Sequence, residues 1–185
     1  IACARLNHLK RLDRVVHAVK IARDRGADCQ LVVAGDGPDR SKLANLVEDL
    51  GISKEVVWLG AVPHDDVWSV MRSGDVFVIN NDHSNRCNPL YEAICAGLPV
   101  VSARDPLTAD LLEEEGNALL AEKDDLESLG CSIYRICTDE ELAANMRVAQ
   151  RQRASQLWSW RERMAEEVRE LEALVGNYKV VAAAV

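Results

Sequence analysis

The sequence predicts a doubly wound α/β fold: a Rossmann-like parallel sheet of about six strands, with helices on both faces and extra helices toward the C-terminal end. Short apolar segments bounded by Gly, Pro, Asn or Asp alternate with amphipathic patterns of helical length. This alternation favours right-handed βαβ units, which build parallel sheets. The 185 residues suit one domain, 1–185, whose final part, 159–185, is expected to form a helix and a tail.

The first half of the chain contains four expected strands and three expected helices. In the first helix, apolar residues recur on one face at Leu12, Val15, Val16 and Val19. The strands are expected at 1–6, 30–34, 56–59 and 75–79. The helices are expected at 11–25, 39–50 and 64–71.

The segment 88–101 has the clearest helix signal. Asn88 is expected as the N-cap and Pro89 at the first helical position, where both residue types are favoured. Gly97 and Pro99 end the helix, and an apolar strand follows. The residues spaced to form its buried stripe are Leu90, Ala93, Ile94 and Gly97.

Glu92 lies on the opposite face of this helix, one turn from its N-terminus. Free N–H groups at a helix N-terminus favour anions. A carboxylate there can accept hydrogen bonds from a vicinal diol while the nearby amides hold a phosphate. A ribose with a diphosphate would satisfy both groups; the simpler alternative is that Glu92 only complements the helix dipole.

The remaining elements are mostly helical. Ser159 and Glu162 fit a capping box for the last helix, and Trp158 and Trp160 suggest anchoring on the domain or on a neighbour. The apolar end at 180–185 is expected to contact a partner or to result from truncation. The expected elements are a helix at 106–114, a strand at 117–120 and helices at 124–136, 139–155 and 160–175.

Composition restricts the partners of the chain. The net charge of −8 and the pI near 5.0 argue against nucleic acid or an anionic membrane as a general partner, so any anion site must be local. No apolar stretch approaches the length of a membrane span. We expect a cytoplasmic protein, with peripheral membrane attachment of the full-length form and the oligomeric state left open. The chain begins without methionine inside an expected strand, which suggests a domain of a longer protein.

The six cysteines are better explained as buried, reduced thiols than as a disulfide framework. They form no Cys-x-x-Cys pair and lie at no zinc-ligand spacing from a histidine. Cys87, beside Arg86, is the candidate for an exposed, reactive thiol. The sequence contains no Asp-x-Asp motif of the kind that would indicate a bound divalent cation. We therefore expect neither a metal nor a cofactor.

Ligands of parallel sheets bind beyond the carboxyl ends of the strands. Arg5 and Lys10 follow the first expected strand, where two cations can neutralise a diphosphate; a solvated loop is the alternative. Gly35 and Gly37 follow the second strand in the sequence GDGP, which lacks the third glycine of a dinucleotide fingerprint. A tight turn with Gly37 at positive φ is the simpler interpretation.

Acid–base candidates are poor. His64, Asp65 and Asp66 are typical of a helix start rather than of a catalytic dyad. Asp82, His83 and Ser84 are adjacent in a loop, where neighbours rarely share a productive geometry.

Taken together, the chain resembles the C-terminal, donor-binding half of GT-B glycosyltransferases of the large retaining GT4 group, over nearly its whole length. The motifs that carry the resemblance are the spacing of Arg5 and Lys10, LVVAGDGP at 31–38, VWLGAVPH at 57–64, DVFV at 75–78, EAICAGLPVV at 92–101 and WSW at 158–160.

The resemblance implies roles for individual residues. Arg5 and Lys10 would hold the donor diphosphate and stabilise the leaving group. Glu92 would accept hydrogen bonds from the ribose, and the backbone at Val62 and Pro63 would contact the base. The helix start, formed by Asn88, Pro89 and Leu90, would face the distal phosphate and sugar. Gly35 and Ser84 complete the expected donor site, and no metal is implied.

Two departures from the family pattern affect the sugar. Ser84 stands where the family has the first glutamate of its Glu-x7-Glu motif, so sugar specificity does not carry over; Asn85 or Arg86 is a possible substitute. Arg104-Asp105-Pro106 replaces a Gly-Gly pair.

Three functions remain open. The first is the donor domain of a retaining glycosyltransferase that uses a UDP- or GDP-sugar, with an absent N-terminal domain that binds the acceptor; the fragment alone would bind nucleotide without transferring sugar. The second is a degenerate, non-catalytic module for assembly or ligand binding. The third is another α/β enzyme, such as a nucleotide-sugar epimerase.

Overall fold

The computed structural model describes residues 1–157, 161–162, 164–165 and 167–172. It divides into two compact units, Ile1–Ala154 and Ser155–Val185. Trp158, Ser159, Trp160 and the apolar end at 180–185, for which we expected a capping box and contact surfaces, lie outside the described residues.

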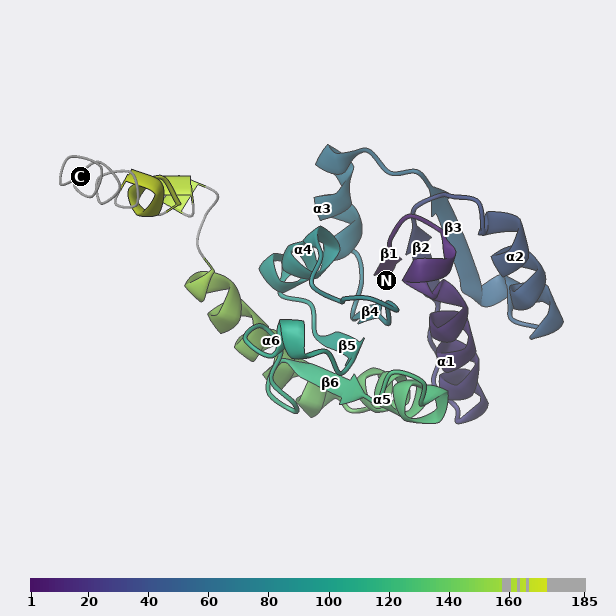
Figure 1. Cartoon of the computed structure of the whole chain (residues 1–185). Coiled ribbons are helices and arrows are strands. Elements are labelled where there is room, and N and C mark those ends of the chain that lie inside the picture. The colour runs from purple at the N-terminus through teal and green to yellow at the C-terminus, as the bar shows by residue number, and fades with distance from the viewer. Residues whose placement is uncertain (158–160, 163, 166, 173–185) are drawn as a thin grey trace. The chain divides into compact units, whose positions relative to one another are not determined.

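The strands form two parallel, three-stranded sheets (Figure 1). The first contains β1 (Ala2–Cys3), β2 (Leu31–Ala34) and β3 (Val56–Gly60) in that order. The second contains β4 (Phe77–Ile79), β5 (Val100–Ala103) and β6 (Ala118–Ala121) in that order. The alternation of strands and helices confirms the predicted α/β class.

The two sheets meet at Ile1. Its ammonium donates a hydrogen bond to the Val76 carbonyl at 2.6 Å, and its carbonyl accepts one from the Val78 amide at 2.9 Å. We expected one sheet of about six strands; no ladder joins β1 to β4, because β1 is only two residues long. Across this junction the strands follow the order 3-2-1-4-5-6, which places the topological switch point between β1 and β4.

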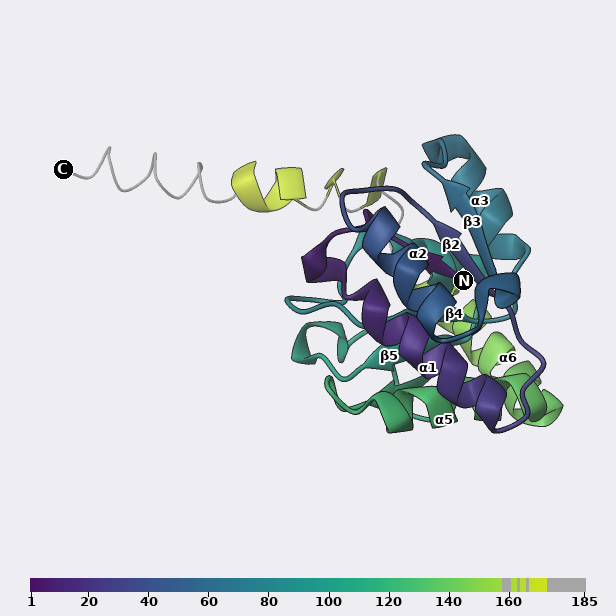
Figure 2. The ribbon, with the colours of Figure 1, turned by 90° about the vertical axis from the view of Figure 1, so that its right-hand side faces the viewer.

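Helices cover both faces of the strands (Figures 1 and 2). On one face, α1 (Leu12–Asp24) packs against α2 (Arg40–Asp49) and α5 (Leu126–Thr138). On the other face, α3 (His64–Arg72) packs against α4 (Asn88–Ala96). A further helix, α6 (Glu140–Gln156), follows α5. Within the described residues, no helix combines the length and apolar character that a membrane crossing requires.

Three of the expected elements are wrong in detail. The first strand, expected at 1–6, spans only Ala2–Cys3. The helix expected at 106–114 is only a short 3-10 turn, Pro106–Thr108, capped by the Asp105 side chain. Cys87, not Asn88, is the N-cap of α4, because its extended backbone (φ −150°, ψ 163°) precedes the first helical residue. Asn88 and Pro89 are therefore the first two residues of the helix.

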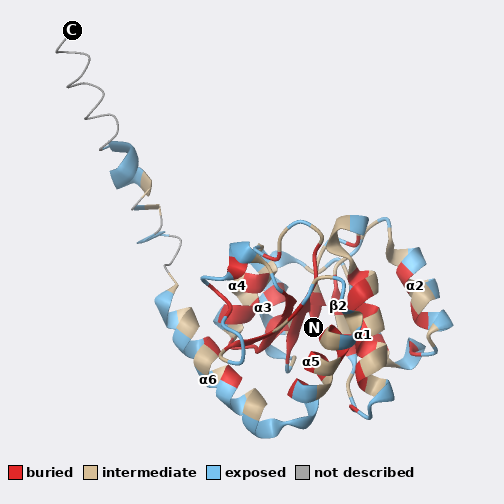
Figure 3. Ribbon diagram, turned by 60° about the horizontal axis from the view of Figure 1, so that its bottom comes forward, coloured by how far each residue is buried: buried red, intermediate tan, exposed pale blue. Residues whose placement is uncertain are grey.

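The turn after β2 packs directly on the loop after β1. A Cβ on Gly35 would lie 1.8 Å from the Ala4 carbonyl oxygen, and one on Gly37 would lie 2.3 Å from the Leu6 oxygen. The positive φ expected at Gly37 belongs instead to Gly35, at 142°. Both glycines are needed for backbone approach, and the buried strands behind them form the core (Figure 3).

Candidate functional site

The loop after β1 presents two cations at the carboxyl edge of the sheet. Lys10 ends a 3-10 turn, His8–Lys10, whose start is capped by the Asn7 side chain. Arg5 is exposed and Lys10 is half-buried. Neither forms an ion pair with any other residue that the structure describes, so both charges remain available to a ligand.

A charged network holds this loop against the loop after β4. Arg11 has a left-handed backbone (φ 41°), and its guanidinium pairs with Asp13 at 2.9 Å and with Asp82 at 3.3 Å. Arg14, only 7% exposed, also pairs with Asp82 at 2.9 Å. The Asp82 amide donates to the Leu9 carbonyl. The position of Lys10 is therefore coupled to the loop that precedes α4.

The start of α4 lies close to Lys10. Burial raises the pKa of the Cys87 thiol, while the charge of Lys10 opposes that rise. Of the three residues expected to face a phosphate, only Asn88 can offer a free amide. Pro89 has none, and the buried Leu90 donates its amide to the Cys87 carbonyl at 3.0 Å.

Glu92 joins this cluster from the first turns of α4. Its Oε1 lies 3.7 Å from Nδ1 of His64, and its side chain is 22% exposed. Pro63 is the N-cap of α3, so this contact brings the Val62–Pro63 segment beside Glu92. Burial and the charge of Glu92 raise the pKa of Cys3, at the end of β1, to about 11. Glu92 therefore lies at the switch point between β1 and β4.

The loop from Asn80 to Cys87 is held by side chains from the segment after β5. The Ser84 hydroxyl donates to Oδ2 of Asp105 at 3.1 Å, and the Asn85 amide donates to the same oxygen at 2.7 Å. The Asn85 side chain is 1% exposed and bonds both the Asn81 amide and the Ala103 carbonyl. Arg86 pairs with Asp110 at 2.7 Å.

These contacts decide which residues can replace the missing glutamate. The Asn85 side chain is buried and bonded through both its oxygen and its nitrogen, so it is not free for a sugar. The Arg86 guanidinium is held by Asp110 and the Leu107 carbonyl but stays partly exposed. Asp105 is the carboxylate that contacts Ser84, and sequence reasoning did not assign it a role. The only signal was that both positions depart from the same family pattern.

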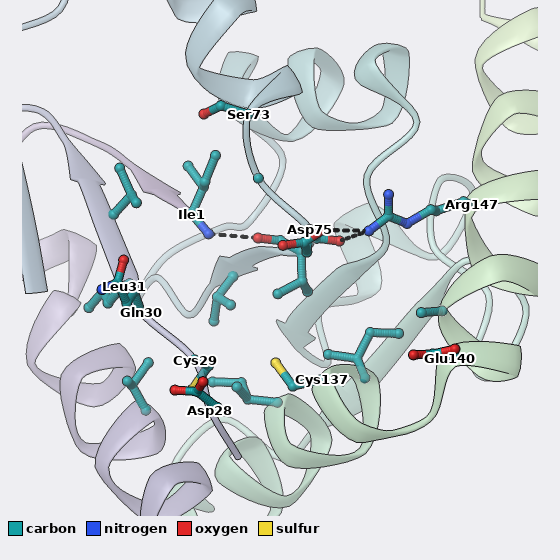
Figure 4. A pocket seen from close by; sticks show the side chains of 18 residues that line it. Ile1, Asp28, Cys29, Gln30, Leu31, Ser73, Asp75, Cys137, Glu140 and Arg147 are labelled. Carbon is teal, nitrogen blue, oxygen red and sulfur yellow. Dashed lines mark hydrogen bonds and ion pairs between the residues drawn. The ribbon is translucent and has the colours of Figure 1, made fainter. Parts of the chain in front are cut away.

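A separate cavity of about 560 Å³ opens at the opposite edge of the strands, beside Ile1 (Figure 4). Cys29 and Cys137 line it, and their hydrogen bond lowers the pKa of Cys29 to about 7. Arg147 pairs with Asp75 across its rim at 2.9 Å. None of the expected donor-site residues lines this cavity.

The cysteines differ from expectation in their exposure. All six are free thiols, but none is fully buried: Cys95 and Cys137 are exposed and the others are half-buried. The expected reactive thiol, Cys87, has a raised pKa because it is partly buried. Among the described residues, no three His, Cys, Asp or Glu side chains come together as metal ligands.

The strand order and the covering helices place this chain in the class of Rossmann-like α/β domains found in GT-B enzymes. Residues 1–153 match the family model for glycosyl transferases group 1. The chain belongs to this family.

The named relatives include glycosyltransferases. The chain is 25% identical over 147 residues to 2-deoxystreptamine N-acetyl-D-glucosaminyltransferase of Niallia circulans, covering 80% of this chain and 38% of the relative. It is 26% identical over 172 residues to GDP-mannose-dependent alpha-(1-6)-phosphatidylinositol monomannoside mannosyltransferase of Mycolicibacterium smegmatis, covering 89% of this chain and 45% of the relative. The chain thus spans less than half the length of these two relatives.

A solved structure shows the same fold. The pneumococcal O-GlcNAc transferase GtfA, in complex with UDP and GlcNAc, aligns with a TM-score of 0.81 at 20% identity. The alignment covers 91% of this chain and 35% of that chain.

Proposed function

We propose that this chain is the donor-binding domain of a retaining glycosyltransferase that uses a UDP- or GDP-linked sugar. The observation that carries the proposal is the proximity of Lys10, the start of α4 and Glu92 at the switch point, where sheets of this order bind ligands. Arg5 lies in the same loop as Lys10. A nucleoside diphosphate has the matching charges and hydroxyls. The names of the family and of the relatives fit this assignment.

In this proposal the two cations bind the diphosphate. Arg5 and Lys10 have no described carboxylate partner, so a diphosphate would neutralise them without displacing an existing ion pair. When the bond to the sugar breaks, negative charge grows on the diphosphate, and positioned cations stabilise it most at that point. The same residues can supply this stabilisation without a metal ion.

The remaining contacts orient the nucleoside. Glu92 accepts hydrogen bonds from the two ribose hydroxyls, and the backbone at Val62 and Pro63 contacts the base beside it. The Asn88 amide contributes a donor toward the distal phosphate. Gly35 acts indirectly, since it allows the turn after β2 to support the loop that carries Arg5.

Sugar transfer requires more than this chain. We propose that an N-terminal domain of the whole protein binds the acceptor and completes the reaction, and that the 185-residue chain alone binds donor without transferring it. The free cysteines fit a reducing compartment such as the cytoplasm.

A second candidate function is a degenerate, non-catalytic domain. The observation that favours it is the departure at Ser84, which removes a carboxylate from the expected donor site. A domain of this kind would self-associate or bind a partner without binding a nucleotide.

Thermal unfolding distinguishes the two functions. A ligand that binds only the folded state raises Tm; at 100 times its Kd, UDP or GDP should raise it by roughly 5–10 °C. Glu92→Gln and Lys10→Met should each reduce the shift, whereas Lys54→Met, an exposed cation in the 3-10 turn before β3, should not. If neither nucleotide moves Tm at millimolar concentration, the donor-site proposal fails.

A further inference from the structure

Asp105 is an acidic residue for which the donor site described above has no use. It follows β5, and its carboxylate contacts the loop after β4 through Ser84 and Asn85, at 3.1 and 2.7 Å. Ser84 Oγ also accepts a hydrogen bond from the Arg86 amide at 3.0 Å. Asp105 and Ser84 therefore fix the backbone that leads into α4.

The strand order determines which part of a donor would reach Asp105. In the proposed complex the nucleoside would lie toward β3, because Glu92 faces His64 at the start of α3. The diphosphate would lie at the centre, between Lys10 and the start of α4. The sugar and the nucleoside are attached to opposite ends of the diphosphate, so an extended donor would place its sugar on the other side, over the carboxyl ends of β4 and β5. Asp105 and Ser84 lie at that side.

The hydrogen bonds of Asp105 leave room for one more. An ionised carboxylate has about four acceptor positions. Oδ2 accepts from the Ser84 hydroxyl and the Asn85 amide, and Oδ1 accepts only from the Leu107 amide at 2.9 Å. One acceptor position therefore remains on Oδ1, and the side chain is only partly buried.

The carboxylate is held in its charged form. Burial raises the pKa of Asp105, but the hydrogen bonds from the amides of Asn85 and Leu107 and from the Ser84 hydroxyl outweigh burial, and the pKa is lowered. Lys123 contributes in the same direction. At neutral pH, Asp105 accepts a hydrogen bond and cannot donate one.

We propose that Asp105 recognises a hydroxyl group of the donor sugar, with Ser84 holding its carboxylate in place. This inference rests on the proposed function, since it assumes that a nucleotide-sugar occupies the switch point. A sugar hydroxyl is a neutral donor, which is the partner that the remaining position on Oδ1 requires. The carboxylate that contacts the donor sugar in this chain thus comes from the segment after β5.

The same geometry predicts that residues 84 and 105 are coupled. A glutamate at 84 would place a second carboxylate beside Asp105, where two negative charges repel each other. One carboxylate at this point is therefore favourable and two are not. Ser84→Glu should weaken sugar-nucleotide binding when Asp105 is present and should strengthen it when Asp105 is replaced by glycine.

Isothermal titration of the 185-residue chain tests the inference. The probes are UDP, UDP-glucose, UDP-N-acetylglucosamine, GDP and GDP-mannose. Asp105→Gly and the shape-preserving Asp105→Asn should raise the Kd of the bound sugar-nucleotide roughly tenfold, while the Kd of the parent nucleotide changes less than twofold. The double variant Ser84→Glu/Asp105→Gly should recover much of the loss. Asp110→Ala is the matched control, because it removes a nearby carboxylate that does not contact Ser84.

The outcomes separate the two proposals. If the unsubstituted chain binds none of the five probes, the proposed function fails and this inference fails with it. If the nucleotides bind but both Asp105 variants weaken nucleotide and sugar-nucleotide equally, or weaken neither, the inference alone is overturned. Binding of UDP or GDP to each variant also shows that the variant is folded.

Discussion

At the scale of single residues, the pKa of the Cys87 thiol shows which charged side chains lie near the start of α4. The charge of Lys10 lowers its pKa and the charge of Glu92 raises it, although burial has the largest effect. Electrostatic interactions fall off with distance and with solvent screening, so both charges must lie close to the start of α4. The three residues come from two segments that are far apart in the sequence.

Cys29 should be the most reactive thiol of the chain. Its hydrogen bond with Cys137 and the charge of Arg23 lower its pKa, which favours the reactive thiolate. At pH 7, a disulfide reagent such as DTNB should modify Cys29 before the other thiols. Cys137→Ala should slow that reaction several-fold, since it removes the donor that stabilises the thiolate.

The control for this measurement is Cys95→Ser. Cys95 is exposed, but burial of part of its side chain and the charge of Glu92 raise its pKa. Removing Cys95 should leave the rapid modification of Cys29, the fast phase of the reaction, unchanged. A fast phase that survives Cys29→Ser would show that the assignment is wrong.

At the scale of elements, the glycine after β2 and the glycine after α2 both have a positive φ but are needed for different reasons. Gly35 combines a φ of 142° with a direct approach to the Ala4 carbonyl. Gly51 has a φ of 69°, but nothing lies within 4 Å of the position of its Cβ. Alanine substitutions at the two positions therefore distinguish the cost of backbone strain alone from the cost of strain together with steric overlap.

Gly35→Ala should destabilise the chain more strongly than Gly51→Ala. The strain of a positive φ alone costs about 1–2 kcal/mol, which is the loss expected for Gly51→Ala. A Cβ at position 35 also forces the two loops apart, so its cost should exceed about 3 kcal/mol. Denaturant unfolding of the two variants measures the difference; equal losses would contradict the steric argument.

The sequence predicted which segments form helices better than it predicted the residues at which those helices begin and end. The apolar face of α1 is a local pattern, and all four residues expected there are buried. Asn88 was placed as an N-cap because of its residue type, but the cap is decided by the backbone of Cys87. The pattern at 106–114 did not produce an α-helix, and its Leu107 remains 58% exposed.

The candidate site could be predicted only in part. Motifs within one loop, such as Arg5 with Lys10, are visible in the sequence. The contact of Ser84 with Asp105 joins positions 21 residues apart, and the contact of His64 with Glu92 joins two helices. Such pairs follow from strand order and loop packing, which no local pattern encodes.

At the scale of the whole molecule, carboxylates make stability depend on pH. The pKa of Asp105 is lowered because its hydrogen bonds outweigh burial, and that of Asp110 is lowered chiefly by its bond with Arg86. A carboxyl whose pKa is lower in the folded state stabilises the fold above its unfolded pKa, near 3.9. That stability is lost as the pH falls through the lower, folded pKa.

Acid should therefore destabilise the unsubstituted chain more steeply than the Asp105→Asn variant. The free energy of unfolding, measured in urea from pH 7 to pH 3, should fall for both proteins and less for the variant. Asp28→Asn is the control, because the Asp28 carboxylate is fully exposed. The same pH slope for the unsubstituted chain and the Asp105→Asn variant would contradict the assignment.

Arg5 and Lys10, which form no ion pair with the residues that the structure describes, have a consequence for how an anion would arrive. The chain carries a net charge of −8, so a distant diphosphate is repelled while one near Arg5 and Lys10 is attracted. Salt at physiological strength shortens the Debye length to about 8 Å, which screens the distant repulsion before it screens the close attraction. Moderate salt therefore favours encounter with this edge of the protein, the reverse of the behaviour expected for an anion approaching a basic surface.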